Sequence, residues 1–507
     1  MLNFIVNKTN EYIENMPKNE RKRYGQFFTS PETAVFMAGL YQNIWQDQEH
    51  ISILDTGAGS GVLTAALLER IAKAPGRLQS VELVCYENDE KILDLLRDNL
   101  EYMGGKVPFQ LQVRIITENY ITSQAKEFAY ALLADPMPQK YDMVIGNPPY
   151  MKIPKDAPEA LAMPNVCYGA PNLYFLFAAM ALFNLEDGRE MVYIIPRSWT
   201  SGAYFKAFRE YFLTEGKLLH VHLFVSRDKV FEKEKVLQET IIIKIMKTQR
   251  VPEYVCITSS NSNHDFADIQ SLDVPYDVVV SGRNRYVYLV TTPVEAQLLA
   301  VMNRWQDTLL DLGMRMKTGL TVDFRERQYL RDIPEENTVP MFFAQHLKDG
   351  RIVYPCGKHG EYLLRGKQAL LQRNSNYLFV KRFTSKEEKR RLQCGIYLSS
   401  QFPAFDFIST QNKINFIDNA THTLSKPVVY GLYVLFNSTM YDQYYRILNG
   451  STQVNSTEIN TMPMPKLAVI IELGLALLAS EDLSEGNCNR ILEEFLNVEE
   501  KRGKRIS

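Results

Sequence analysis

Four consecutive residues, Asn147, Pro148, Pro149 and Tyr150, carry groups that could bind a planar amine. They follow an apolar run at residues 141–146 that predicts a buried strand, and open α/β sheets bind ligands just past the carboxyl ends of such strands. Asn147 offers a side-chain carbonyl, the prolines hold their carbonyls stiffly because φ is fixed, and Tyr150 offers a flat ring. Two acceptors beside a stacking face suit the exocyclic amine of adenine. The alternative is an ordinary turn, in which Pro-Pro pairs are common.

A glycine-rich turn at residues 57–61 follows a short apolar strand that ends at Asp55. Apolar periodicity continues after the turn, which predicts a helix there. Glycines such as Gly57 and Gly59 let the backbone approach a ligand closely, and the start of the helix presents free N–H groups. The G-x-G-x-G spacing differs from the G-x-G-x-x-G of dinucleotide sites, so the turn is weak evidence when taken alone.

The next predicted strand, residues 81–86, ends at Glu87. An acidic residue at the end of the second strand is placed to accept hydrogen bonds from two ribose hydroxyls. Asn88 and Asp89 are expected to start the following helix, because both residue types are good helix caps.

Together these residues resemble the S-adenosylmethionine-dependent methyltransferases that modify amino groups on DNA bases. Residues 23–31 sharpen the resemblance to the adenine-N6 enzymes of the gamma class, in which this segment precedes the glycine turn and covers the methionine end of the cofactor. Residues 29–32 are also an ordinary helix start. The resemblance implies S-adenosylmethionine as the cofactor. The implied cofactor-binding residues are Phe27, Thr29, Pro31, Asp55, Gly57, Gly59, Glu87 and Asn119.

Two of the implied site residues have alternatives. Many of these enzymes carry Asp-Phe after the third strand, where this chain has Asn119 and Tyr120, and the register could slip to Glu118. Phe231 matches an aromatic residue that stacks on the target base opposite the motif tyrosine, although a place in the core explains a phenylalanine equally well. The implied catalytic residues are Asn147, Pro148, Pro149, Tyr150 and Phe231.

Residues 147–150, called the prolyl corner from here on, predict that the methyl group passes directly from the cofactor to the amine. Adenine's N6 lone pair is delocalised into the ring, and hydrogen bonds to Asn147 Oδ1 and the Pro148 carbonyl would favour a pyramidal, nucleophilic nitrogen. The sulfonium methyl is already activated, so positioning and oriented dipoles should suffice without a metal or an enzyme nucleophile. The base must be flipped out of the duplex to reach such a pocket, where Tyr150 could stack on it.

Two stretches of the C-terminal half resemble the type II modification enzymes of the PstI/BsuBI kind, which are expected to modify adenine in CTGCAG. Residues 376–391 resemble a target-recognition region, and residues 451–456 resemble the terminal motif of that group.

A basic stretch with interleaved aromatic residues, from residue 365 to residue 413, predicts a DNA-binding surface. The predicted DNA contacts are Lys381, Arg382, Lys386 and Arg390. A solvated helix face at residues 386–391 is the alternative. A second and weaker basic candidate consists of Arg315, Lys317, Arg325 and Arg327.

The composition is that of a globular protein of 507 residues, long enough for two sizeable domains. The net charge of −2 excludes a wholly basic DNA binder, so phosphate contacts must come from local patches. No apolar run is long enough to span a membrane, and the first residues lack a signal-peptide pattern. The six cysteines are scattered without zinc spacing, which predicts reduced thiols, no metal and a cytoplasmic protein.

Alternating strands and helices up to about residue 250 predict a parallel sheet. The expected fold is α/β, with a Rossmann-like S-adenosylmethionine-dependent methyltransferase domain at residues 1–250. A mixed α+β target-recognition domain is expected at residues 251–465, followed by a helical tail at residues 466–507.

The predicted function is site-specific methylation of adenine N6 in double-stranded DNA, as the modification enzyme of a type II restriction–modification system. A monomer is expected, without stable contact to the cognate restriction endonuclease. One alternative is a methyltransferase for protein glutamine or RNA amino groups, which the long C-terminal half disfavours. Another is a DNA-binding module without catalysis, which the cofactor residues disfavour. A fused nuclease is disfavoured because no Pro-Asp precedes a Glu-x-Lys.

Overall fold

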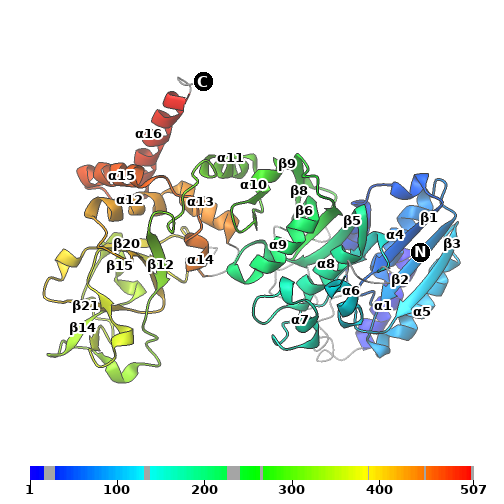
Figure 1. The fold of residues 1–507 in the computed structure, drawn as a ribbon, viewed down its shortest axis with the longest axis horizontal. Helices are drawn as coiled ribbons and strands as arrows, with labels where there is room; N and C mark the ends of the chain where they lie inside the picture. The colour runs from blue at the N-terminus through cyan, green and yellow to red at the C-terminus, as the bar shows by residue number, and fades with distance from the viewer. Residues whose placement is uncertain are drawn as a thin grey trace. The chain divides into compact units, whose positions relative to one another are not determined.

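The computed structural model describes residues 1–15, 29–130, 138–224, 240–262, 266–385, 388–449 and 453–503. They form two compact units, Met1–Thr292 and Pro293–Ser507 (Figure 1). Within these residues, every helix is too short or too polar to cross a membrane.

The N-terminal unit is built on a nine-stranded sheet of order β3-β2-β1-β4-β5-β7-β6-β8-β9. The strands from β3 to β5 run parallel to their neighbours, while β7 is antiparallel to both β5 and β6. The strands are β1 (His50–Asp55), β2 (Ser80–Tyr86), β3 (Gln110–Ile116), β4 (Tyr141–Gly146), β5 (Leu185–Pro196), β6 (Gly216–Phe224), β7 (Thr240–Lys247), β8 (Tyr254–Ser260) and β9 (Gln270–Pro275). This topology confirms the predicted Rossmann-like fold.

The strand order reverses between β1 and β4. The chain runs outward from β1 through β2 to β3 and then returns to place β4 on the other side of β1. Loops that leave the carboxyl ends of β1 and β4 therefore diverge, and open α/β sheets bind their ligands in the resulting crevice. The glycine turn and the Asn-Pro-Pro-Tyr segment both leave the sheet at this point.

The central strands are apolar on both faces. Ile53, Leu83 and Met143 pack into one core cluster with helices from the first 104 residues, while their neighbours Leu54 and Val144 are buried on the opposite face. This double burial explains why these strands are continuous apolar runs without polar alternation. The helices of the cluster are α1 (Leu2–Asn15), α3 (Pro31–Gly39), α4 (Val62–Lys73) and α5 (Glu90–Gly104).

A buried ion pair docks the end of α3 on the sheet. Lys244 Nζ lies 2.9 Å from Glu190 Oε1 and donates to the Leu40 carbonyl at 2.8 Å. Glu190 Oε2 accepts the Gln42 N–H at 3.0 Å. A charge buried in this way requires such partners, so the pair holds α3 in one position against β5 and β7. The start of α3, and with it Thr29, is thereby placed relative to the sheet.

The C-terminal unit contains a six-stranded sheet of order β12-β22-β19-β20-β16-β15 and a five-stranded sheet of order β13-β17-β14-β21-β18. Phe342 of β14 (Thr338–Phe342) packs with Phe379 of β19 (Tyr377–Lys381) and Tyr397 of β20 (Cys394–Tyr397), so an aromatic core joins the two sheets. The remaining strands are β12 (Met314–Thr318), β13 (Leu330–Arg331), β15 (Leu347–Lys348), β16 (Gly350–Ile352), β17 (Tyr362–Leu364), β18 (Gln372–Arg373), β21 (Phe407–Thr410) and β22 (Ile414–Asn419).

Helices α12 (Lys426–Phe436) and α15 (Leu467–Ser480) cross at two glycines. A Cβ at Gly431 would lie 1.8 Å from the Ile470 carbonyl oxygen, and one at Gly474 would lie 1.8 Å from that of Pro427. Only glycine permits such a close approach of two backbones. Helix α15 is therefore packed into the C-terminal unit.

These observations differ from the predicted boundaries. The units divide after Thr292, because β8 and β9 continue the N-terminal sheet beyond residue 250. Residues 466–480, assigned from sequence to a helical tail, pack on α12. Neither pairing leaves a local pattern in the sequence, since both depend on residues far away in the chain.

Replacement of Gly431 by alanine should destabilise the C-terminal unit by about 3 kcal/mol, because the new methyl group meets backbone that cannot move without separating the helices. Gly486→Ala is the matched control, since a Cβ at Gly486 meets nothing within 4 Å in helix α16 (Glu485–Gly503). Thermal unfolding of both variants checks this. An equal melting temperature for Gly431→Ala and Gly486→Ala would refute the proposed helix crossing.

Candidate active site

The Asn-Pro-Pro-Tyr segment leaves β4 through a glycine that the packing requires. A Cβ at Gly146 would lie 2.7 Å from Thr56 Oγ1 and 2.8 Å from Tyr193 Cζ. The hydroxyls of Thr56 and Tyr193 are hydrogen-bonded to each other across this position. The end of β4 is thus pressed against β1 and β5, and Asn147 begins from a fixed point.

Three parts of the chain hold the Asn147 amide. Its Nδ2 donates to Thr29 Oγ1 at 3.1 Å, and its Oδ1 accepts the hydroxyl of Tyr150 at 2.7 Å. The Tyr150 hydroxyl also lies 3.0 Å from the Ile194 carbonyl of β5. The amide nitrogen thus faces an acceptor, and the amide oxygen faces a donor. The amide is therefore oriented with its oxygen as a hydrogen-bond acceptor.

Tyr150 is buried, and its ring meets that of Tyr174 edge-on at 6.3 Å. Burial raises the pKa of the Tyr150 phenol above its ordinary value, with a smaller contribution from Tyr174. The hydroxyl therefore stays protonated at neutral pH and remains a donor. Pro148 is buried and Pro149 half-buried, so the whole corner is held by its surroundings.

The N-terminal segment reaches this corner as the sequence predicts. Ser30 caps α3 by accepting the Thr33 N–H, and Pro31 occupies the first turn of the helix. The preceding residue, Thr29, makes the hydrogen bond to Asn147. Phe27 lies outside the described residues.

The glycine turn between β1 and α4 has left-handed backbone at Gly59 (φ 54°) and Gly61 (φ 85°). A Cβ at Gly59 would meet nothing within 4 Å, whereas one at Gly57 would lie 3.9 Å from the Asn147 carbonyl oxygen and 4.0 Å from the Phe177 ring. Gly57 is thus the point where the turn, the prolyl corner and α8 (Leu173–Asn184) approach one another.

Two carboxylates lie at the ends of neighbouring strands. Asp55 is fully buried, with Oδ2 accepting the Thr64 hydroxyl at 2.7 Å. Glu87 accepts the Gly59 N–H at 2.8 Å on Oε2 and the Asp89 N–H at 2.9 Å on Oε1. Each oxygen of Glu87 therefore keeps a further acceptor position, which two hydroxyls of a ribose could use. Burial raises the pKa of Glu87, and backbone N–H donors, those of Asp89 and Gly59 foremost, oppose that shift.

Asn119 is engaged differently from its prediction. Its Oδ1 accepts the N–H groups of Ile121 and Thr122, each at 3.0 Å, and its Nδ2 donates to Glu159 Oε1 at 2.8 Å. The carbonyl expected to serve the adenine amine is thus occupied by the turn after β3. The carboxylate of Glu159, in α7 (Pro158–Ala162), lies beside Asn119 instead.

Three aromatic side chains, Tyr86, Tyr120 and Phe177, pack against one another near the glycine turn. Tyr120 packs at 4.8 Å from Tyr86 and at 5.0 Å from Phe177, measured between ring centroids. Phe177 is half-buried and Tyr120 is buried. The apolar run that contains Phe177 predicts a helix, but nothing in that run separates a pocket side chain from core ones.

The comparisons with known proteins agree with this geometry. The family model of the Eco57I restriction-modification methylase matches residues 76–231. The chain is 33% identical over 502 residues to the type II methyltransferase M.BsuBI of Bacillus subtilis, with 97% of each chain covered. It is also 33% identical over 478 residues to the type II methyltransferase M.PstI of Providencia stuartii, with 92% of this chain and 91% of that one covered.

The chain belongs to the type II methyltransferases. It is a DNA methyltransferase of the restriction–modification kind. The fold is also similar to that of the type IIL restriction-modification enzyme MmeI, solved in complex with DNA, with a TM-score of 0.50 at 11% identity over 97% of this chain and 73% of that one.

The family implies S-adenosylmethionine as the cofactor of this methyltransferase, and the residues present fit it. Asp55 Oδ1 is buried without a hydrogen-bond partner among the described residues, and Glu87 keeps acceptor positions on both oxygens. Open space around Gly59 leaves room for a ligand. Two carboxylates with spare acceptor capacity match a group that carries a cation and a ribose.

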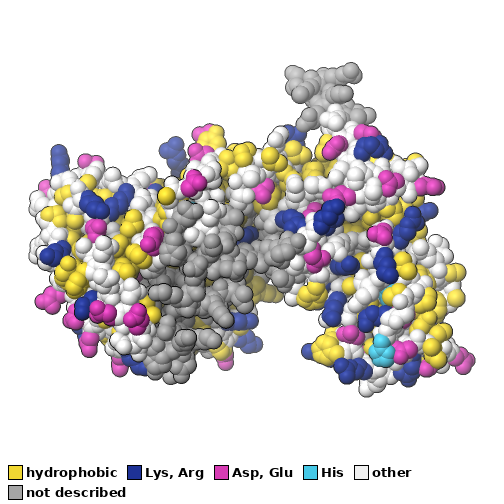
Figure 2. Space-filling view, turned by 180° about the vertical axis from the view of Figure 1, so that it is seen from behind, with side chains coloured by type: hydrophobic (Ala, Val, Ile, Leu, Met, Phe, Trp, Pro, Cys, Tyr) yellow, Lys and Arg dark blue, Asp and Glu magenta, His cyan; other side chains and the backbone are white. Residues whose placement is uncertain are grey.

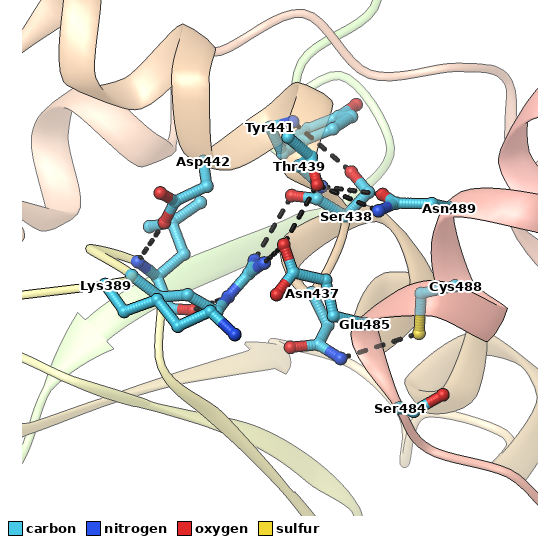
Figure 3. A network of polar contacts seen from close by, with 12 residues as sticks. Lys389, Asn437, Ser438, Thr439, Tyr441, Asp442, Ser484, Glu485, Cys488 and Asn489 are labelled. Atoms are coloured by element: carbon cyan, nitrogen blue, oxygen red, sulfur yellow. Dashed lines mark hydrogen bonds and ion pairs between the residues drawn. The ribbon is translucent and has the colours of Figure 1, made fainter.

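The predicted DNA contacts have different surroundings. Arg390 Nη1 lies 2.8 Å from Glu485 Oε1, and its Nη2 donates to the Phe436 and Ser438 carbonyls at 3.1 and 3.2 Å. Figure 3 shows Glu485 and Ser438 within this polar network, together with Thr439 and Asn489. The structure therefore places Arg390 inside the C-terminal unit, where a carboxylate and two backbone carbonyls are its partners. This corrects its expected place on a DNA-binding surface.

Lys381 and Arg382 remain half-exposed. Lys381 Nζ donates to Gln393 Oε1 at 2.8 Å, and Arg382 Nη1 donates to the Asn412 carbonyl at 3.1 Å. The Arg382 guanidinium also lies 5.5 Å from the ring of the exposed Phe383. Lys386 and Phe231 lie outside the described residues.

The two C-terminal stretches with family resemblance meet in space. The Val454 N–H donates to the Arg382 carbonyl at 2.7 Å, and Phe383 bridges to Gln453. Asn415 Nδ2 also donates to the Val454 carbonyl at 2.7 Å. Gln453 and Val454 therefore lie alongside the predicted recognition region and form backbone hydrogen bonds like those of a short strand.

A group of His346, Cys356 and Glu361 has ligand atoms within 4.8 Å of one another. The Phe343 N–H donates to His346 Nδ1 at 2.8 Å, so the ring proton is on Nε2, which lies 2.6 Å from Glu361 Oε1. Glu361 also accepts the N–H groups of Cys356 and Gly357. These bonds satisfy the group as a hydrogen-bond network, in which Nε2 is a donor and has no lone pair to offer a metal.

The buried carboxyl group of Asp55 should make the free energy of unfolding depend on pH. Its burial raises the pKa to about 7, with Thr64 opposing the shift. The unfolded state loses this proton near pH 4, so rising pH disfavours the fold between about pH 4 and 7, with an upper limit of about 4 kcal/mol. Asp55→Asn cannot titrate and should gain stability relative to the natural chain across this window.

Urea unfolding at pH 5 and pH 8 measures this difference in the free energy of unfolding. The advantage of Asp55→Asn should be larger at pH 8 by a few kcal/mol. A difference between the two proteins that is the same at both pH values would contradict the raised pKa.

Proposed function

We propose that this chain methylates the exocyclic N6 of adenine in duplex DNA, and that the base is turned out of the helix to reach the prolyl corner. The observation that carries the proposal is the fixed Asn147 amide at the end of β4, which Thr29 and Tyr150 orient with its oxygen as a hydrogen-bond acceptor. An adenine amine needs such an acceptor, because a hydrogen bond from N–H draws the lone pair of N6 out of conjugation.

The residues of the corner divide the work. Thr29 holds the amide nitrogen, so Asn147 presents oxygen to the amine. Pro148 supplies a second carbonyl from a backbone that cannot turn, since its φ is fixed at about −65°. Tyr150 keeps the corner in place through its hydroxyl, and stacking of the base on its ring would contribute about 1–3 kcal/mol.

The cofactor supplies a methyl group that a sulfonium already activates. The work left to the protein is to hold the amine in line with that methyl group and to exclude competing water. Asp55, Gly57, Gly59 and Glu87 lie at the ends of β1 and β2, next to the end of β4 that carries Asn147. This arrangement supports methyl transfer from a cofactor bound at the ends of β1 and β2 to a base bound at the end of β4.

The target implied by the resemblance to the PstI/BsuBI group is CTGCAG. We further propose a cytoplasmic monomer that acts beside a separate restriction endonuclease. Six free cysteines support a reducing compartment. Lys381 and Arg382 stay among the proposed DNA contacts because both are partly exposed next to Phe383.

Expression in a host that lacks its own DNA methyltransferases, followed by long-read modification detection on genomic DNA, tests the proposal. We expect N6-methyladenine at one short recurring sequence, and none in cells that carry Asn147→Ala. Methylated cytosine, or an unmodified genome with well-folded protein present, would overturn it.

A further inference from the structure

The outer edge of the six-stranded sheet in the C-terminal unit carries a groove lined by basic and hydroxyl side chains. Strand β12 is the edge strand and pairs only with β22 among the described strands. Met314 and Met316 point into the core, whereas Arg315 and Lys317 are exposed on the other face of the same strand. Two cations therefore project side by side from one edge.

A side-chain clamp closes this edge. Asn460 Oδ1 accepts the Met316 N–H at 2.7 Å, and Asn460 Nδ2 donates to the Met316 carbonyl at 3.0 Å. The amide thus satisfies both backbone groups of Met316, which blocks the pairing of an added strand at this residue. The clamp also fixes α14 (Ser456–Ile459) and Thr461 beside β12.

Between these elements lies a groove of about 390 Å³, lined by Arg315 and Lys317 on one side and by Ser456 and Thr457 on the other. Thr461 also lines it, but its hydroxyl donates to the Thr457 and Glu458 carbonyls. None of the described residues that line it is acidic. Asp418, on β22, lies 2.9 Å from Lys317 Nζ and neutralises that cation in part. Arg315 and the hydroxyls of Ser456 and Thr457 consequently provide most of the groove's capacity for an anion.

The charge balance sets this groove apart from a larger cavity of about 760 Å³ in the same unit. That cavity is lined by Lys348, Arg351, Lys381 and Arg390, but also by Asp349, Glu481, Asp482 and Glu485. The cavity as a whole therefore carries no excess of positive charge. Figure 2 shows Lys and Arg side chains interspersed with acidic ones over one face of this unit, so charge alone does not define the binding surface.

We infer that the groove between β12 and α14 binds a backbone phosphate of the DNA duplex. This inference rests on the proposed function, which supplies DNA as the source of the phosphate. A guanidinium with hydroxyl donors opposite it is a good partner for phosphate oxygens. Contacts of this kind set the register of the protein on DNA and do not distinguish bases.

The dependence of duplex binding on salt tests the inference. The full-length protein, Arg315→Ala and the control Lys348→Ala are titrated with a CTGCAG duplex and with an unrelated duplex between 50 and 200 mM salt. Lys348 is an exposed cation of the mixed-charge cavity. Arg315→Ala should reduce the slope of log K against log salt by about 0.9. It should also weaken the binding of both duplexes about equally, on the order of tenfold at 0.1 M salt.

Arg315→Lys should restore most of the slope, and Lys348→Ala should leave it unchanged. An unchanged slope for Arg315→Ala, or a loss confined to one of the two duplexes, overturns the phosphate assignment while the natural protein still methylates DNA. If the natural protein neither binds nor methylates DNA, the proposed function fails, and the groove loses its ligand with it.

Discussion

The orientation of one amide, that of Asn147, is the constraint on which the rest of the site depends. Its nitrogen is held by Thr29, which precedes α3, and its oxygen by Tyr150, which is itself held by the Ile194 carbonyl of β5. Thr29 and Ile194 lie far from the prolyl corner in the sequence, and Ile194 comes close to it because β4 is inserted between β1 and β5. The sheet order therefore determines the chemistry of the corner.

The same sheet buries two carboxyl groups at the ends of its strands. Asp55 and Glu87 end neighbouring strands and are buried, so both have raised pKa values. Burial of these groups is costly to the fold unless a ligand or hydrogen bonds offset it. A site of this kind is preorganised for a cationic cofactor bearing a ribose, because its acceptors are already in position before anything binds.

The sequence was sufficient to predict the elements in which local pattern and burial coincide. Continuous apolar runs predicted β1, β2 and β4, and polar residues directly after these strands predicted where the site lies. The helix start at Ser30 and Pro31 was also predicted from residue type.

Long-range contacts account for what the sequence did not reveal. Asn119 was assigned by register, yet its oxygen is used by two backbone N–H groups, and Glu159 reaches it from forty residues away. Arg390 lies in a basic run typical of a surface, yet Glu485 and two helix-end carbonyls enclose it. The partners of Arg390 are absent from the local sequence, whereas Asn119 combines two local N–H donors with the distant Glu159.

The most direct measurement is the single-turnover rate of methyl transfer to a target duplex by Asn147→Ala and Asn147→Asp, with the affinity for S-adenosylhomocysteine as control. Loss of the acceptor should slow Asn147→Ala by about 100-fold or more at unchanged cofactor affinity. Asn147→Asp keeps an oxygen acceptor and should retain more of the rate. Transfer by Asn147→Ala at nearly the natural rate would show that the amide oxygen does not act on the reacting amine.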